Sequence, residues 1–300
     1  MSGNHSGGRG LEQDDVTTVV MTRDRRDELL RTVERTQGAL VVVDNGSSDG
    51  TVEALRALER PGLTVVPLRR NVAAVARTIG ARAARTPLVA FADDDSWWAP
   101  GSLEAAAATF DRYPRLGLLA GRVLVGTEER DDPFNDVLAG SPLGRPDDLP
   151  GPMLLGFIAC AAVVRRDAYL ATGGFDDVVG FVGEEERVAL DLASAGWGLS
   201  YVEDAVVHHH PSPRRSSPAH RQAVVEHHAL LTAVMRRPWD VVRRRHAQRT
   251  APLPVPRRTA AQSFMKALRH RKRLPPHVEA WARQLDDRTS PAPLGDVAVT

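Results

Sequence analysis

The sequence predicts an α/β protein built on a doubly wound, mainly parallel sheet. Short β-branched runs alternate with segments of helical apolar spacing through the first third of the chain. Because crossovers between parallel strands are right-handed, such strands lie side by side in one sheet. The 300 residues, 42% hydrophobic and 26% charged, allow one large domain with an appendage and exclude a collagen, coiled-coil or wholly disordered chain.

The individual elements follow from this periodicity. Apolar runs predict strands over residues 16–21, 40–43, 63–67, 88–92, 116–125 and 199–207. Helical spacing predicts helices over residues 25–36, from Thr51, and over residues 72–84, 102–113 and 184–195. Residues 126–152 are rich in Pro, Gly and Asp and are expected to form a long surface excursion, after which structure resumes over residues 154–164.

The chain divides into three expected regions. These are a disordered tail over residues 1–14, an α/β domain over residues 15–215 and a helical extension over residues 216–300, which the Pro-rich run APLPVPRR interrupts as a linker. The tail lacks the apolar core of a signal peptide and no window approaches about 20 apolar residues, so a cytoplasmic protein is expected. The single cysteine, Cys160, lies in the apolar run GFIACAAVV and is expected to be buried.

The extension carries a strong charge asymmetry. Over residues 236–273, many Arg and Lys residues are opposed by Asp240 alone, although the net charge of the chain is +1. With the apolar Trp239, Val241 and Val242 beside them, these charges predict weak contact with anionic lipid at the inner face of the membrane, or with an acidic acceptor. A solvated helical face is an equally good interpretation.

Three adjacent carboxylates, Asp93, Asp94 and Asp95, follow the strand LVAFA. Like charges at this spacing repel one another unless a cation or strong donors compensate them. Hard oxygen ligands suit Mg²⁺ or Mn²⁺, and a diphosphate would share such a cation. A solvated acidic turn or a helix N-cap is the alternative for an isolated triplet, but its position after a strand favours a binding site.

Two further strand ends are selected by the rule that ligands of doubly wound sheets bind beyond the carboxyl ends of the strands. Thr22 and Arg23 follow the first strand, and Asp44 and Asn45 follow the second. We expect these residues and the acidic triplet to line one cleft.

Several ordered motifs over residues 16–210 make the chain resemble the family 2 glycosyltransferases, which have the GT-A nucleotide-sugar fold. The resemblance is carried by VVVDNGSSDGT, NVAAVARTIGARAA, FADDD, GGFDDVVGFVGEEERVALDLASAGW and DAVVHHHPS. The segment MTRD stands where the family usually has a Pro-Thr-Tyr-Asn type segment, so an atypical base pocket is expected.

The resemblance implies roles for the donor-site residues. Asp44 corresponds to the residue that accepts a hydrogen bond from the nucleotide base, although capping the next helix is an equally good interpretation. Arg77 corresponds to the donor-site Arg that pairs with phosphate, with a surface Arg on an amphipathic helix as its alternative. Asp93 is expected at the ribose or the cation and Asp95 at the cation directly, while Asp94 serves either purpose.

The resemblance also implies a catalytic base on the acceptor side. Glu184 and Glu185 align with the Glu-Asp pair of the family, and Glu185 is the expected base. Because Glu stands where Asp is usual, the choice among Glu184, Glu185 and Glu186 stays open. Acids in the first turn of a helix also favour the helix dipole, which is compatible with either role.

Three consecutive histidines and two tryptophans complete the expected site. His209 corresponds to the cation-binding His of the family, and alternation along a strand places His208 and His210 on the opposite face. Trp97 and Trp98 follow the acidic triplet. We expect both rings to pack in the core, and stacking of at least one of them on a sugar ring is the less favoured alternative.

Together these expectations predict an inverting, metal-dependent glycosyltransferase. The base takes a proton from an acceptor hydroxyl, whose oxygen attacks the anomeric carbon while the metal-bound diphosphate leaves. The predicted partners are a nucleotide diphosphate-sugar donor and a carbohydrate, lipid-linked or small-molecule acceptor, and no nucleic acid. A nucleotide-sugar-binding pseudoenzyme is the alternative. A nucleotidyltransferase is less favoured because TRDRRDELL holds no glycine-rich phosphate loop.

Overall fold

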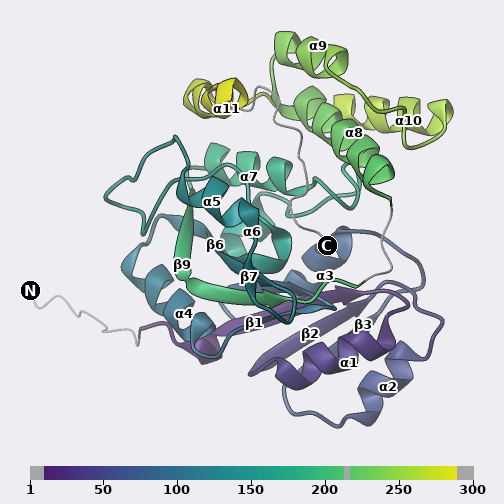
Figure 1. Cartoon of the computed structure of the whole chain (residues 1–300), viewed down its shortest axis with the longest axis vertical. Coiled ribbons are helices and arrows are strands. Elements are labelled where there is room, and N and C mark those ends of the chain that lie inside the picture. The colour runs from purple at the N-terminus through teal and green to yellow at the C-terminus, as the bar shows by residue number, and fades with distance from the viewer. Residues whose placement is uncertain (1–9, 213–216, 289–300) are drawn as a thin grey trace, which may run out of the picture.

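A computed structural model describes residues 10–212 and 217–288, and a single sheet forms its centre (Figure 1). The strands are β1 (Val16–Thr22), β2 (Ala39–Asp44), β3 (Leu63–Pro67), β4 (Leu88–Asp93), β5 (Ser96–Trp98), β6 (Leu116–Val125), β7 (Arg130–Asp131), β8 (Ala162–Arg165) and β9 (Gly198–His209). The helices are α1 (Arg26–Arg35), α2 (Thr51–Ala57), α3 (Val75–Ala83), α4 (Ser102–Arg112), α5 (Pro133–Ala139), α6 (Arg166–Ala171), α7 (Glu185–Ser194), α8 (Pro218–Arg236), α9 (Trp239–Ala247), α10 (Arg257–Arg269) and α11 (Pro276–Arg288).

The sheet has the strand order β3-β2-β1-β4-β8-β6-β9-β5, with β7 paired to β6. The first four strands in this order run parallel to one another, as do β6 and β9. Strands β8, β5 and β7 run antiparallel to their neighbours. The prediction of an α/β fold on a mainly parallel, doubly wound sheet is therefore confirmed.

Strand β4, which carries the acidic triplet, is buried on both faces. Leu88 and Ala90 pack into a cluster that includes residues of α4, whereas Val89 and Phe91 pack into a second cluster that includes residues of α3 and α7. All four side chains are fully buried. A strand covered by helices on both faces reads as a continuous apolar run, and it holds its carboxyl end rigidly.

The predicted surface excursion over residues 126–152 contains more structure than expected. It includes β7 and α5, whose N-cap Asp132 accepts a hydrogen bond from the backbone of Phe134, with Pro133 in the first helical position. The side chain of Asn135 binds both backbone groups of Val123, at 3.0 and 2.9 Å, and so ties α5 to β6. The Pro and Gly content concealed an N-cap followed by proline, which is a helix-start signal.

Other expected boundaries shift slightly. Structure between residues 154 and 164 is reduced to the short strand β8, preceded by the 3-10 turn Ala159–Ala161. Residues 1–9 of the predicted tail and the predicted domain boundary at residue 215 lie outside the described residues. Within the tail, Gln13–Asp15 forms a 3-10 helix instead of disorder, because Glu12 and Asp15 form a capping box. Cys160 is buried as expected, and burial raises the pKa of its thiol.

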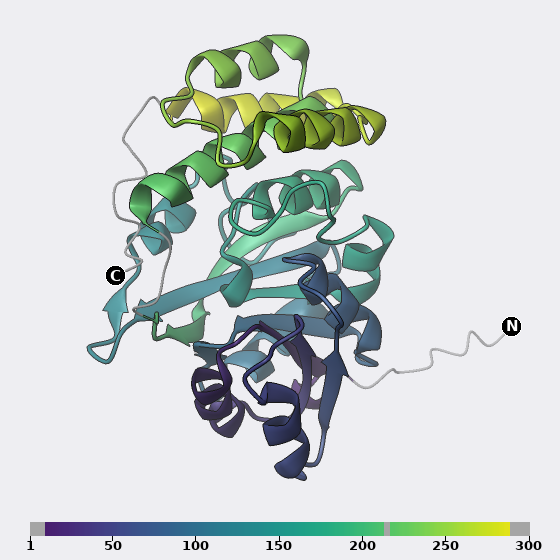
Figure 2. The ribbon, with the colours of Figure 1, turned by 90° about the vertical axis from the view of Figure 1, so that its right-hand side faces the viewer.

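Helices α8 to α11 form a layer on the side of α7, far from β1, β2 and β3 (Figure 2). Apolar side chains of α8, α9 and α10 form a common cluster, and Val278 and Ala282 of α11 join the cluster that contains α7. Val241 and Val242 are buried, so the expected apolar surface beside the basic residues is reduced to Trp239, which is 45% exposed. Among the described residues, no helix is both long and apolar enough to span a bilayer.

Candidate functional site

The carboxyl ends of the parallel strands meet at one edge, as expected. Thr22 at the end of β1 pairs in register with Asp44 at the end of β2. Its neighbour Met21 pairs with Asp93 at the end of β4. Three strand ends that are far apart in the sequence therefore present their polar side chains side by side.

Asp44 orders the turn that follows β2. Its carboxylate is buried and accepts hydrogen bonds from the backbone N–H groups of Gly46 and Ser47, at 3.2 and 3.0 Å. Gly46 has a φ of +77°, and an added Cβ would lie 3.2 Å from the backbone of Arg70, so the turn requires glycine. These bonds shape the turn itself, whereas α2 begins after Gly50 without a side-chain cap. Asp44 therefore does not cap the next helix, and the expected contact with the nucleotide base stays a prediction.

Arg25 stands between two carboxylates of the acidic triplet. Its Nη1 lies 2.7 Å from Asp94 Oδ1, and its Nη2 lies 2.9 Å from Asp95 Oδ2. Thr22 donates a hydrogen bond to Asp94 Oδ2 at 3.0 Å, and Thr32 donates one to the backbone carbonyl of Asp94 at 2.9 Å. The repulsion predicted for three adjacent acids is thus partly offset by the guanidinium of Arg25 and the hydroxyl of Thr22.

The two carboxylates differ in their pKa. Burial raises the pKa of Asp94 to about 7, with Asp93 and Asp95 adding to the effect and Arg25 opposing it. Burial also acts to raise the pKa of Asp95. The hydrogen bonds and charges of His209 and Arg25 outweigh that effect and hold its pKa well below the usual range. Asp95 is therefore ionised at neutral pH, whereas Asp94 is close to its midpoint.

His209 reaches the triplet because β5 pairs antiparallel with β9. Its Nε2 lies 3.4 Å from Asp95 Oδ1, and the backbone N–H of His210 donates to the carbonyl of Asp95 at 2.8 Å. His208 and His210 lie on the other face, where both contact the ring of Trp97. The predicted alternation of the three histidines is confirmed.

The two tryptophans pack against protein. The guanidinium of Arg35 lies 4.3 Å from the ring centroid of Trp97, and His208 stacks on the same ring. Trp98 is buried and donates a hydrogen bond to the carbonyl of Phe91. Trp98 therefore packs in the core, as expected first. Trp97 is only partly buried and packs against charged and polar side chains outside the apolar clusters.

Arg77 joins the acidic triplet to the acceptor-side segment. Its side chain is 1% exposed, and its guanidinium lies 2.5 Å from Asp93 Oδ1 and 3.1 Å from Glu184 Oε1. Although burial acts to lower it, the pKa of Arg77 is raised by Asp93 and Glu184. Arg77 is therefore no surface residue. The structure pairs it with carboxylates, and contact with a phosphate remains a prediction.

The three consecutive glutamates have different partners. Glu184 is buried against Arg77, and Glu186 forms two hydrogen bonds with Arg245, at 2.7 and 2.9 Å. Glu185 is the first residue of α7 and is only partly buried. Burial raises the pKa of both Glu184 and Glu185, against the opposing charge of Arg77. Glu185 thus combines partial exposure with an elevated pKa, which are properties of a general base.

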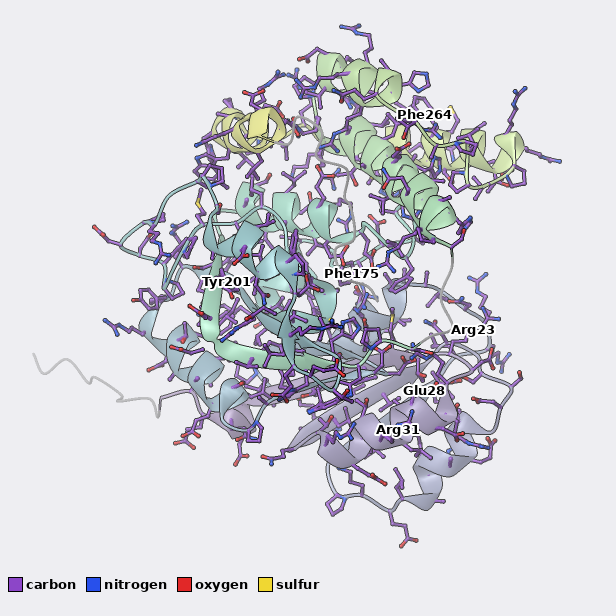
Figure 3. The ribbon with its side chains drawn as sticks, viewed as in Figure 1. Arg23, Glu28, Arg31, Phe175, Tyr201 and Phe264 are labelled. Atoms are coloured by element: carbon purple, nitrogen blue, oxygen red, sulfur yellow. The ribbon has the colours of Figure 1, made fainter. Side chains whose placement is uncertain are left out.

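Arg25, and not the expected Arg23, turns toward the acidic triplet. The side chain of Arg23 is 51% exposed and pairs with Asp24 at 3.4 Å, and Figure 3 shows it toward the edge of the molecule, beside α1. Arg77, in contrast, points inward. Its guanidinium is 5.6 Å from the ring centroid of Phe175, which Figure 3 shows near the middle of the molecule. The strand-end rule located the segment correctly, but it could not tell which arginine of TRDRR turns inward.

A divalent cation fits part of the predicted ligand set. Asp95 supplies an ionised carboxylate next to the imidazole of His209, whereas Asp93 turns to Arg77. Among residues 10–212 and 217–288, no three His, Cys, Asp or Glu side chains are grouped around a common metal position. Mg²⁺ and similar ions are commonly held by one or two carboxylates together with substrate phosphates, so two protein ligands are compatible with such a cation.

The fold and the acidic edge define this chain as an α/β protein with the GT-A architecture. The family described as "Glycosyl transferase family 2" matches residues 17–172, and the chain belongs to this family. That match covers both the acidic triplet and Arg77.

Two similar proteins are known from Mycobacterium tuberculosis. The N-acetylglucosaminyl-diphospho-decaprenol L-rhamnosyltransferase is 30% identical over 205 residues, which cover 57% of this chain and 66% of the relative. The pre-mycofactocin glycosyltransferase is 29% identical over 263 residues, which cover 82% of this chain and 51% of the relative. The chain thus spans a little under two thirds of one relative and about half of the other.

Among solved structures, the mannosyltransferase PcManGT from Pyrobaculum calidifontis in complex with GDP-Man and Mn²⁺ is similar in fold. Its TM-score is 0.57 at 21% sequence identity, with 92% of this chain and 76% of the other covered. This similarity supports the fold assignment alone.

Proposed function

We propose that the chain is an inverting glycosyltransferase that transfers a sugar from a nucleotide diphosphate-sugar to an acceptor hydroxyl. The observation that carries the proposal is the ion-pair chain Asp93–Arg77–Glu184, which places the partly exposed Glu185 next to the acidic edge of the sheet. A donor site and a base are both needed for a transfer with inversion, and this chain of contacts joins the two.

In this mechanism Glu185 accepts the proton of the acceptor hydroxyl as its oxygen attacks the anomeric carbon. Glu184 and Glu186 are paired with Arg77 and Arg245, which leaves Glu185 as the partly buried acid of the three that forms neither of these ion pairs. Its elevated pKa improves its ability to take a proton near neutral pH. Inversion needs no covalent enzyme intermediate, because one displacement completes the transfer.

The donor is proposed to bind along the strand ends. Thr22, Arg23, Asp44, Asp93 and Asp94 lie at the ends of β1, β2 and β4, where the base, ribose and diphosphate of a nucleotide sugar would lie in a doubly wound sheet. Asp95 and His209, with Asp93 as a further candidate, would hold a divalent Mg²⁺ or Mn²⁺ ion. Such an ion stabilises the charge that develops on the departing diphosphate.

The acceptor is proposed to be lipid-linked, among the carbohydrate, lipid-linked and small-molecule classes that the sequence allowed. The name of the mycobacterial rhamnosyltransferase describes a diphospho-decaprenol-linked sugar as its acceptor, which supports this choice. Cytoplasmic location with weak contact at the inner face of the membrane through the basic C-terminal region is part of the same proposal. Trp239 and the exposed arginines of α9 and α10 are the residues that support it.

Incubation with Mn²⁺ and a panel of nucleotide sugars, followed by assay of free nucleotide diphosphate, tests this function. We expect slow metal-dependent hydrolysis of one donor, because water enters where the acceptor is absent. A pseudoenzyme binds the donor without releasing nucleotide diphosphate. A nucleotidyltransferase instead releases pyrophosphate from a nucleoside triphosphate and a sugar phosphate.

Calorimetry on Asp95→Asn tests the metal requirement. We expect the affinity for the nucleotide diphosphate with Mn²⁺ to fall at least about tenfold, the effect of losing one ligand or its support. Binding without Mn²⁺ should change little. Asp167→Asn is the matched control, because Asp167 lies in α6 and its side chain is 93% exposed. Equal affinities for the two variants would remove Asp95 from the cation site.

A further inference from the structure

The C-terminal layer holds α7 through two carboxylates. Glu186, in the first turn of α7, is bound by both terminal nitrogens of Arg245, at 2.7 and 2.9 Å. One turn later, Asp191 is bound by Arg236 of α8, with Nη2 at 3.0 Å from Oδ2. The helix that begins with Glu185 is thus fixed from outside the α/β part of the chain.

Arg245 contacts α8 and α11 as well as Glu186 of α7. Its Nη1 donates to the backbone carbonyl of Ala229 in α8 at 2.9 Å, and its Nη2 lies 3.4 Å from Asp286 in α11. Asp286 also pairs with Arg237 and Arg244, each at 2.8 Å. Arg245 itself is only 18% exposed, so its guanidinium has little freedom to move.

Two local features leave the first turn of α7 in need of support beyond the Arg77–Glu184 pair. No side chain caps the helix at Glu184. The two preceding residues, Val182 and Gly183, both have positive φ, at 79° and 87°, and positive φ is unfavourable for a β-branched residue such as valine. The carbonyl of Val182 is within 2.7 Å of His228 Nδ1 in α8, so the same layer also holds the turn.

We propose that Arg245 is a positioning residue, which orients the first turn of α7 through Glu186 and thereby aims the carboxylate of Glu185 at the acceptor hydroxyl. The inference rests on the proposed function, since it takes Glu185 as the base. It assigns the C-terminal helices a part in catalysis without contact to either substrate. A shift of about 1 Å in a reacting group can lower the rate about 100-fold, so a loosened turn should affect turnover before substrate binding.

Three single variants test the proposal. Arg245→Met keeps the length and removes the charge, and Arg245→Lys keeps the charge and loses the two-pronged contact. Arg283→Met is the control, because Arg283 of α11 also pairs with two carboxylates, Asp240 and Glu279, but is 38% exposed. We expect Arg245→Met to lower kcat about 10- to 100-fold, with the enzyme concentration corrected for donor-binding sites counted by calorimetry and with the donor KM unchanged. Arg245→Lys should recover part of kcat. A kcat for Arg245→Met equal to that of Arg283→Met overturns the proposal.

The double variant Arg245→Met/Glu186→Gln separates positioning from stability. Removing both partners eliminates the unpaired charge, so Tm should recover toward the wild-type value. Under the proposal kcat stays low because the contact between Arg245 and Glu186, which orients the turn, is absent. Recovery of kcat in parallel with Tm would show that Arg245 only stabilises the fold.

Hydrogen exchange gives a readout that does not depend on activity. We expect faster exchange of the backbone amides at the start of α7 in Arg245→Met and unchanged exchange there in Arg283→Met. If the wild-type protein turns over no donor, the proposed function fails, and hydrogen exchange still decides whether Arg245 holds α7. Unchanged exchange in Arg245→Met overturns the inference whatever the activity.

Discussion

The acidic edge of the sheet and the C-terminal helical layer both contain buried arginine–carboxylate pairs. They differ in the number of carboxylates for each arginine. At the edge, two arginines face five carboxylates, namely Arg25 and Arg77 against Asp93, Asp94, Asp95, Glu184 and Glu185. In the network that joins the layer to α7, Glu186, Asp191, Glu279 and Asp286 each have at least one close guanidinium. An excess of carboxylates favours the binding of a cation or a proton at the edge. A network of balanced ion pairs instead holds helices in fixed positions.

The largest effect on turnover is expected from Glu185→Gln, at the acidic edge where carboxylates are in excess. Glutamine keeps the shape and removes the basicity, and positioned proton transfer contributes about 10² to 10⁴ in rate. We expect turnover to fall by that factor with nearly unchanged donor affinity, as measured by steady-state kinetics and calorimetry. Glu184→Gln and Glu186→Gln are matched neighbours, and full turnover in Glu185→Gln with loss in either of them would move the base by one residue.

The comparison is sharpened by removing one buried arginine from each region. Arg77 and Arg237 are both 1% exposed and each pairs with two carboxylates. Breaking such pairs leaves buried charges uncompensated, so Arg77→Met and Arg237→Met should each lose about 3–5 kcal/mol in the free energy of unfolding. Urea denaturation measures this loss. Only Arg77→Met should also change nucleotide diphosphate affinity, and an equal change in both variants would contradict the distinction between site and scaffold.

A smaller effect is expected from pH, through Asp94. Its pKa of about 7 in the folded protein exceeds the ordinary value of 3.8. The folded state therefore binds more protons than the unfolded state between these values, so the stability contributed by protonated Asp94 is complete below about pH 4 and is lost as pH rises through 7. In metal-free buffer, the wild type should lose at least about 1 kcal/mol relative to Asp94→Asn between pH 5 and 7, because one pKa unit corresponds to about 1.4 kcal/mol.

Thermal melts of the wild type and Asp94→Asn across this range provide the measurement. Asp95 does not interfere, since its lowered pKa contributes stability that is lost only in acid. Parallel curves for the two proteins would mean that Asp94 is ionised in the folded state throughout.

The smallest effect is expected at the outer surface of the C-terminal layer. Much of its charge is internally paired, but Arg243, Arg257 and Arg258 are exposed. We expect weak co-sedimentation with anionic vesicles at low salt, lost at high salt and reduced when these three residues are changed to glutamine. Neutral vesicles are the control. Binding that is absent at low salt, or indifferent to salt, would remove the membrane proposal.

Local pattern was sufficient to predict much of the fold and one side of the site. Strand β4 was recognisable because a run buried on both faces is continuously apolar, and the triplet after it had to lie at the sheet edge. The alternation of His208, His209 and His210 followed from strand geometry alone. Helix α5 was missed, because its Asp132-Pro133 start signal lies within a stretch whose composition is typical of a loop.

The sequence by itself determined the main strands and helices of the α/β part and the edge that carries the polar strand ends, because both depend on periodicity and short-range geometry. Only the tertiary structure decided which charges meet. Arg25 rather than Arg23 turns to the triplet, and Arg245 pairs with Glu186 across a long stretch of chain. Along the sequence, the basic C-terminal segment has many more basic than acidic side chains, which suggested an exposed basic surface. Its partners come from α7 and α11, and Coulomb energy depends on distance in space and on burial rather than on separation along the chain.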